Sequence, residues 1–200
     1  RIAIKIRTLE LLSVFDMLCL VILIVIQTLA AMKMAVLNKL LEQRAYTDTH
    51  TGLPNKSACE ELLNNKDTVG KHTACIMFDL NNLKIINDTK GHLMGDQLIL
   101  NFAGLLRNVI PQKDFVGRYG GDEFMVVIYN TSKTEIEDIL KQLSREKDRL
   151  NSSGNNMPID YACGWAISDA DSECTIQMLL DKADYYMYEN KQAYKKFKKS

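Results

Sequence analysis

The sequence has no net charge, no paired cysteine motif and no visible internal repeat. Its 25 lysines and arginines balance 25 aspartates and glutamates, so it lacks the basic surplus that attracts proteins to nucleic acid. None of the five cysteines forms a C-x-x-C pair or has zinc-ligand spacing with the three histidines. An odd, scattered set of thiols is typical of a reducing compartment. We therefore expect no nucleic-acid partner and a cytoplasmic globular part.

The composition that is present fits one packed domain with an appendage. Apolar residues make up 46% of the chain and charged residues 25%, which is typical of a globular core. A chain of 200 residues is too short for two large domains.

A long apolar segment separates the first fifth of the chain from the rest. Between Leu11 and Ala31 the only charged residue is Asp16. A helix over this segment would be about 30 Å long, which is enough to cross a bilayer. We therefore predict a transmembrane span at about residues 11–31, which would anchor the chain in a cell membrane. Cationic residues flank the segment on both sides, so charge bias does not fix its orientation.

The alternative for this segment is a buried or coiled-coil helix in a soluble dimer. Asp16 favours that alternative, because a carboxylate inside a span costs about 2.5–3.5 kcal/mol. After the apolar segment, Met34, Leu37 and Leu41 have a three-then-four spacing that could pair two parallel helices. We place the domain boundary near Tyr46, giving an N-terminal helix over 1–45 and a second domain over 46–200. A sensor upstream of this sequence is also expected.

Beyond residue 46, strand-like and helix-like patterns alternate. The pair Gly120-Gly121 separates two strand-like runs, and we expect both glycines to supply the positive φ angles of a tight hairpin turn. Strands that alternate with helices, with one central hairpin, predict an α/β (α+β) sandwich with a mixed central sheet. The expected elements are a helix at about 56–64, three further helices whose apolar faces run through 98–109, 136–143 and 176–187, and strands over 73–80, 115–119, 123–130 and about 158–168.

Three carboxylates are expected to meet at one edge of this sheet. Asp79 ends a buried strand, and Asp122 and Glu123 directly follow the glycine turn. Clustered carboxylates repel one another unless a hard cation joins them, and Mg²⁺ with phosphate oxygens meets that need. The two glycines leave room for a phosphate near the backbone, and Lys84 and Lys191 could neutralise it.

These residues carry a family resemblance. Residues 118–124 read RYGGDEF, the signature of the GGDEF diguanylate cyclases, and other blocks of that family follow the same order over about 46–195. Five ordered blocks are far more specific than one short motif. The other blocks are DTHTGLPN at 48–55, FDLNNLKIIND at 78–88, GH and GD at 91–92 and 95–96, and AD with Tyr188 and Lys191 near the end.

The resemblance implies a fold similar to class III nucleotide cyclases and polymerase palms. It implies a homodimer in which each domain binds one GTP and the 3′-hydroxyl of one nucleotide attacks the α-phosphate of the other, giving cyclic di-GMP and pyrophosphate. Asp79, Glu123 and the carbonyl of Leu80 are implied ligands of Mg²⁺ (or Mn²⁺). Asp122 would assist deprotonation or share the metal.

Substrate-binding residues are implied in the same way. Lys84, Lys191 and Lys195 match the triphosphate positions, while Asn87 and Asp96 match the guanine contacts. Asp96 can accept hydrogen bonds from guanine but not from adenine, which would make the site selective. Without the resemblance, Asn87 and Asp96 would be better interpreted as caps at helix starts.

The sequence departs from the family pattern at several positions. A second acid is often found two residues after Asp79, and here the residue is Asn81. Lys195 stands where arginine is usual, and lysine offers no bidentate fork. The family's product-inhibition motif is Arg-x-x-Asp. Asp114 is present, but Pro111 replaces the arginine, so we expect weak or absent feedback inhibition.

Two other function classes compete with the enzyme. A catalytically silent GGDEF domain could bind GTP or cyclic di-GMP as a sensor, although such domains typically lose the acidic signature that is complete here. A purely structural or dimerising domain would not need clustered acids and lysines at these spacings. The three histidines lack the partners of a nucleophilic triad, so other reaction classes are disfavoured.

Overall fold

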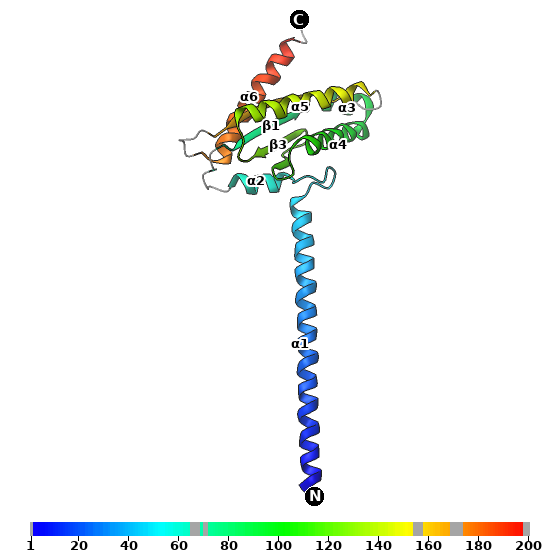
Figure 1. Ribbon diagram of the computed structural model, residues 1–200. Helices are drawn as coiled ribbons and strands as arrows, with labels where there is room; N and C mark the ends of the chain where they lie inside the picture. The colour runs from blue at the N-terminus through cyan, green and yellow to red at the C-terminus, as the bar shows by residue number, and fades with distance from the viewer. Residues whose placement is uncertain (1, 65–68, 70–71, 154–157, 169–173, 198–200) are drawn as a thin grey trace. The chain divides into compact units, whose positions relative to one another are not determined.

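The computed structural model describes residues 2–64, 69, 72–153, 158–168 and 174–197, and at 2–12, 43 and 194–197 it describes the backbone alone. The chain divides into two compact units, Arg1–Ala45 and Tyr46–Ser200. Figure 1 shows both units along the chain.

The first unit is occupied by one long helix, α1 (Ile2–Tyr46), so the expected N-terminal helix is confirmed. The side chains of 13–42 are all exposed in this chain, including many large apolar ones such as Phe15 and Ile22. The segment Ser13–Tyr46 is long and apolar enough to cross a membrane, judged by length and composition alone.

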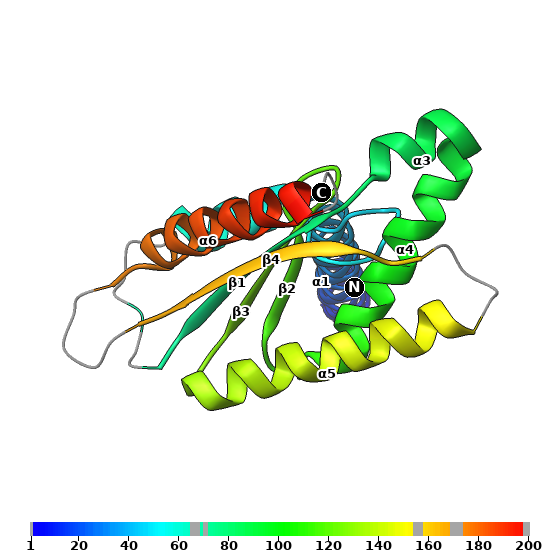
Figure 2. The ribbon, with the colours of Figure 1, turned by 90° about the horizontal axis from the view of Figure 1, so that it is seen from above.

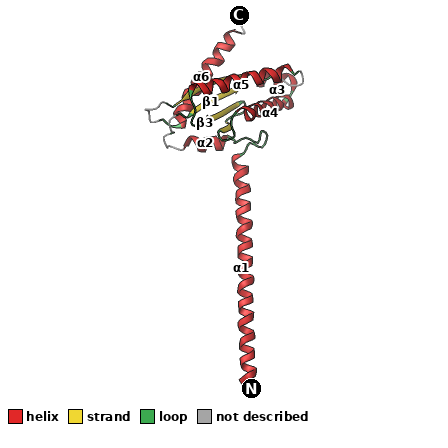
Figure 3. Ribbon diagram, in the orientation of Figure 1, coloured by secondary structure: helices red, strands yellow, loops and turns green. Residues whose placement is uncertain are grey.

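The second unit is built on a four-stranded sheet whose strands lie in the order β2–β3–β1–β4. Figure 3 separates these strands from the surrounding helices by colour. The strands are β1 (Ala74–Leu80), β2 (Phe115–Arg118), β3 (Glu123–Ile128) and β4 (Tyr161–Ile167), and the helices are α2 (Lys56–Asn64), α3 (Leu83–Lys90), α4 (His92–Val109), α5 (Lys133–Ser152) and α6 (Ile176–Phe197).

The order β-α-β-β-α-β with this strand arrangement is the ferredoxin-like topology, and it confirms the α+β class. All three described strand pairings are antiparallel, whereas the sequence predicted a mixed sheet. Helices α3 and α4 connect β1 to β2, and α5 connects β3 to β4; each connection joins two strands that run in the same direction. Each also passes over one strand, β3 in the first case and β1 in the second. β1 therefore lies between β3 and β4, and no two parallel strands are neighbours in the described sheet.

Strand alternation divides the core into two layers. Phe78 on β1 and Phe124 on β3 face α4 and α5, where both rings pack edge-on against Phe102. Met77 and Met125 point to the opposite face, which α2 and α6 cover. Figure 2 shows α6 on one side of the sheet and α4 and α5 on the other. Residue 79 therefore points toward α6, because side chains two apart on a strand share a face.

Local capping explains where two of the helices begin. The side chain of Asn55 accepts a hydrogen bond from the backbone N–H of Ala58 at 3.1 Å, so Asn55 caps the start of α2. Ser132 and Glu135 form a reciprocal capping box at the start of α5, so two backbone donors are satisfied at that end.

Helix α6 packs against β4 at a glycine. A Cβ atom on Gly164 would lie 2.1 Å from the backbone nitrogen of Met187 and 2.3 Å from the carbonyl oxygen of Ala183. Helix and strand backbones are therefore closer here than any side chain would permit. This contact determines how deeply α6, which carries Lys191, lies on the sheet.

The expectation of positive φ angles at Gly120-Gly121 was wrong. Among described glycines only Gly52 and Gly91 have positive φ. Four residues connect β2 to β3, so the turn is longer than the two-residue hairpin that requires positive φ. Both Tyr119 and Gly120 donate their backbone N–H to the carbonyl of Glu123, at 2.9 and 3.2 Å.

Candidate active site

Two of the predicted acids face each other across neighbouring strands. Asp79 near the end of β1 is the register partner of Glu123 at the start of β3, and both side chains belong to the face covered by α6. Directly opposed like charges destabilise an antiparallel pair. This position therefore requires a cation.

In this structure Lys191 of α6 supplies the cation. Its Nζ lies 2.6 Å from Oδ2 of Asp79. The Asp79 side chain is 9% exposed and that of Lys191 27%. The other carboxylate oxygen of Asp79, Oδ1, is buried without a hydrogen-bond partner among the described residues. Burial of an unpaired acceptor is costly, so Asp79 retains capacity to bind a further donor or cation.

The surroundings of Glu123 are crowded with negative charge. Burial raises the pKa of Glu123 above its ordinary value, and the charges of Asp122, Asp79 and Asp184 raise it further, while Lys191 partly offsets them. Gly120 leaves the space that the carboxylate needs, because a Cβ there would lie 2.6 Å from Oε2 of Glu123. A side chain at position 120 would therefore make the flexible carboxylate of Glu123 move, although the φ angle of Gly120 is not positive.

The donor set fits a divalent cation. Oxygen ligands with several carboxylates suit Mg²⁺, and here an unpartnered oxygen of Asp79 lies opposite a Glu123 whose ionisation is resisted by its neighbours. However, the described residues contain no group of three or more acidic, histidine or cysteine side chains already close enough to hold a metal ion. The four-member ligand set of Asp79, Leu80, Asp122 and Glu123 thus stays a prediction.

The electrostatic crowding at Glu123 predicts that Glu123→Gln stabilises the metal-free protein. The native pKa is raised above the ordinary 4.5, so ionising Glu123 costs stability as the pH rises from about 4.5 through the raised pKa. Glutamine removes that cost. Because solvent screens a partly buried group, we expect the melting temperature at pH 7 to rise by only about 1–2 °C.

Thermal unfolding in EDTA would measure this effect, with the exposed Glu189→Gln on α6 as the matched control. A lower melting temperature in Glu123→Gln than in Glu189→Gln would contradict the crowding argument. The difference between the variants should shrink as the pH approaches 4.5.

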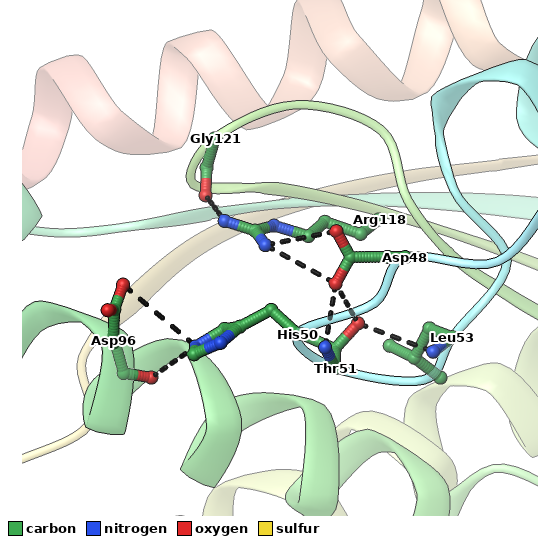
Figure 4. A network of polar contacts seen from close by, with 7 residues as sticks. All are labelled: Asp48, His50, Thr51, Leu53, Asp96, Arg118 and Gly121. Atoms are coloured by element: carbon green, nitrogen blue, oxygen red, sulfur yellow. Dashed lines mark hydrogen bonds and ion pairs between the residues drawn. The ribbon is translucent and has the colours of Figure 1, made fainter.

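The turn that carries Asp122 is tied to β1 and to the segment after α1. The carbonyl of Asp122 accepts a hydrogen bond from the N–H of Leu80 at 2.9 Å. On the other side, Arg118 donates to the carbonyl of Gly121 at 2.8 Å and pairs with Asp48 at 3.2 Å (Figure 4). The turn is therefore held from both sides.

Asp48 and Arg118 both belong to the family motifs, but the sequence did not predict that they form an ion pair. Asp48 also accepts hydrogen bonds from the N–H and hydroxyl of Thr51 at 2.7 and 2.6 Å (Figure 4). Burial raises the pKa of Asp48, but the Thr51 hydrogen bonds and the Arg118 charge outweigh it, so the net pKa is lowered. The D-x-x-T spacing is a signal for this local turn. The partner 70 residues away has no local signal.

We expect Arg118→Met to destabilise the domain by about 1.5–3 kcal/mol, the range for hydrogen bonds to charged groups. Asp48→Asn should cost less, because asparagine keeps an acceptor for Thr51. Urea unfolding of both single variants and the double variant measures the coupling, with the exposed Arg145→Met as the control. Fully additive losses would show that the ion pair does not hold the turn.

The predicted guanine residues come together through helix packing. A Cβ on Gly95 would lie 1.9 Å from Oδ1 of Asn87, so Asn87 on α3 presses against the backbone beside Asp96 on α4. Neither residue caps a helix start, because the cap positions are Asn82 and Gly91, so the capping interpretation was wrong. His50 reaches the same place, with Nε2 3.2 Å from the carbonyl of Asp96 (Figure 4).

The remaining predicted residues are distributed as follows. Lys84 is exposed in the first turn of α3, and Lys191 contacts Asp79 rather than pointing freely to solvent. The side chain of Lys195 lies outside the described residues. Asp114 accepts a hydrogen bond from the N–H of Tyr129 at 3.1 Å, and with Pro111 it lines two pockets of about 300 and 360 Å³.

With this geometry established, comparison with known proteins identifies the family. Residues 45–196 match the family model described as diguanylate cyclase, GGDEF domain. The chain is 32% identical over 161 residues to the signaling protein YkoW of Bacillus subtilis, covering 77% of this chain and 20% of that protein. It is 31% identical over 155 residues to the diguanylate cyclase DgcP of Pseudomonas aeruginosa, covering 76% and 23%.

A solved microbial GGDEF domain, described for its interaction with cyclic di-GMP, matches with a TM-score of 0.64 at 27% identity, over 76% of this chain and 94% of that one. The chain therefore belongs to the GGDEF domain family, and the resemblance seen in the motifs is confirmed. Other relatives are named cyclic di-GMP phosphodiesterases. The chain spans only about a fifth to a quarter of the length of YkoW and DgcP.

Proposed function

We propose that this chain is an active diguanylate cyclase that condenses two GTP molecules into cyclic di-GMP, releasing pyrophosphate. The observation that carries the proposal is the convergence on one sheet edge of Asp79, Glu123 and Lys191 beside an intact RYGGDEF turn. A domain that has only a structural role has no need for two acids opposed across neighbouring strands, which reduce its stability.

The proposed chemistry assigns a role to each acid. Mg²⁺ or Mn²⁺, held by Asp79, Glu123 and the Leu80 carbonyl, would polarise the α-phosphate and lower the pKa of the attacking 3′-hydroxyl. Asp122 or Glu123 accepts the proton from that hydroxyl.

The cationic and polar residues would hold the substrate. Lys84, Lys191 and Lys195 neutralise the triphosphate, and Gly120 and Gly121 let it approach the backbone. Oδ1 of Asn87 is buried without a hydrogen-bond partner among the described residues, so it is available to accept from the exocyclic amine of guanine. Asp96 accepts from the guanine N–H groups, and adenine would leave these acceptors unpaired.

Because each domain would hold one GTP, the product requires two copies of the chain. We propose that the copies form a two-fold homodimer, paired by the seam at Met34, Leu37 and Leu41. We also propose that α1 crosses the bacterial inner membrane at about residues 11–31, which leaves the catalytic domain in the cytoplasm. Crosslinking of cysteines placed at 37 and 41 would test the seam.

Turnover of GTP with Mg²⁺ by the full chain in a nonionic detergent tests the proposed function. We expect cyclic di-GMP from the native chain, none from Glu123→Gln and no analogous product from ATP. A native chain that binds GTP without turnover, even when two copies are crosslinked, would contradict the enzyme and support the sensor alternative.

We also expect that cyclic di-GMP does not inhibit the reaction by binding at Asp114. Pro111 offers no cation for a phosphate, and Asp114, which accepts a hydrogen bond from the N–H of Tyr129 through one oxygen, cannot supply one. A large excess of added cyclic di-GMP should leave the initial rate unchanged, while Pro111→Arg should introduce inhibition. Inhibition of the native chain that Asp114→Asn abolishes would contradict this prediction.

A further inference from the structure

Lys191 forms a contact that competes with its expected role. Its ammonium group lies 2.6 Å from Oδ2 of Asp79, whereas the family resemblance assigns it to the triphosphate. The ammonium group and a divalent cation cannot both sit against the Asp79 carboxylate, because the two positive charges would repel each other in a partly buried site.

We infer that Lys191 is an exchangeable counter-ion, which occupies Asp79 in the nucleotide-free protein and leaves it when a divalent cation binds. The inference rests on the proposed function, since it concerns the same carboxylate. In its second position the ammonium group pairs with the nucleotide triphosphate.

The two partners differ in their freedom to move. Asp79 lies on β1, which is paired on both sides by β3 and β4, and its side chain is almost completely buried. Lys191 is three times as exposed, at 27% against 9%, and its flexible stem can swing the ammonium group without moving α6. Lys191 is therefore the partner that leaves.

The exchange has a thermodynamic consequence. Without nucleotide, a cation must displace Lys191 from Asp79, so cation binding is weakened. A triphosphate offers the ammonium group another anionic partner and frees Asp79. Nucleotide and cation should therefore strengthen each other's binding by the same factor, since such coupling is reciprocal.

The test measures Mn²⁺ binding to the full chain without nucleotide, using the electron paramagnetic resonance signal of free Mn²⁺. Lys191→Met removes the competitor, and we expect it to bind Mn²⁺ about tenfold more tightly than the native chain, within the usual range of coupling between sites. Lys191→Gln is a second neutral variant with the same expectation. Lys191→Arg keeps the charge and should bind like the native chain.

Lys182→Met is the matched control, because Lys182 is an exposed lysine of the same helix and its removal changes the net charge equally. Thermal unfolding followed by the fluorescence of Trp165 verifies that each variant is folded. Equal or weaker Mn²⁺ binding in both neutral Lys191 variants, or an equal gain in Lys182→Met, would overturn the inference. Failure of the proposed function would be seen separately, as absence of cyclic di-GMP in the product assay.

Discussion

Replacing Asp79 by asparagine should reduce cyclic di-GMP synthesis by about 10³-fold, because loss of a metal-ligating carboxylate removes several kcal/mol of transition-state stabilisation. The carboxylate is buried, faces Glu123 and has one oxygen without a hydrogen-bond partner in the described part of the chain. Asparagine keeps the shape and one acceptor but carries no charge. Product formation at saturating GTP measures the loss.

The fold should survive this substitution. Lys191 is partly exposed, so its ammonium group can turn to solvent when Asp79 is neutralised. Asp138→Asn on α5, an exposed acid that pairs with Lys141, is the matched control and should retain full activity. Near-native synthesis in Asp79→Asn would remove Asp79 from the proposed metal site.

Replacing Gly164 by alanine should have the largest effect on stability. The new Cβ would lie 2.1 Å from the backbone nitrogen of Met187, and neither backbone can yield without separating α6 from β4. We expect a loss of about 3 kcal/mol or more, at the upper end for overpacking. Urea unfolding, followed by the single tryptophan of the chain, Trp165, measures it.

Gly104→Ala is the matched control for this change. Gly104 lies in α4, and apart from the adjoining helix backbone no heavy atom of the described residues lies within 4 Å of its added Cβ, so alanine there should stabilise the helix by up to about 1 kcal/mol. Since α6 carries Lys191, any folded Gly164→Ala should also lose GTP turnover. A Gly164→Ala protein as stable as the native chain would show that α6 does not pack at this distance.

Strong local patterns made most elements predictable. The helix expected over 56–64 has the bounds of α2, and the strand expected over 73–80 begins one residue later as β1, because apolar runs and a capping Asn55 act locally. Helix α3 escaped prediction. It is short and contains no buried residue, so its sequence lacks a strong apolar stripe.

The turn glycines show a limit of local reasoning. A Gly-Gly pair indicates positive φ angles by propensity. The turn between β2 and β3 has four residues, however, and is long enough to form without positive φ at Gly120 or Gly121. The glycine at 120 instead leaves space for the carboxylate of Glu123 in its present position. Backbone propensity describes which φ angles a residue can adopt. Whether a glycine serves a turn through its φ angle or through its lack of a side chain is decided by the residues around it.

The sequence by itself determined the family, the identity of the acids and the departure at Pro111, because motif letters and their order do not depend on three-dimensional contacts. Only the tertiary structure decided which charges are paired. Lys191 and Asp79 are 112 residues apart, and Arg118 and Asp48 are 70 apart. Strand register places Asp79 opposite Glu123, and the glycine contact at β4 brings α6 close enough for Lys191 to reach Asp79. Such pairings depend on packing between distant segments, which local sequence does not encode.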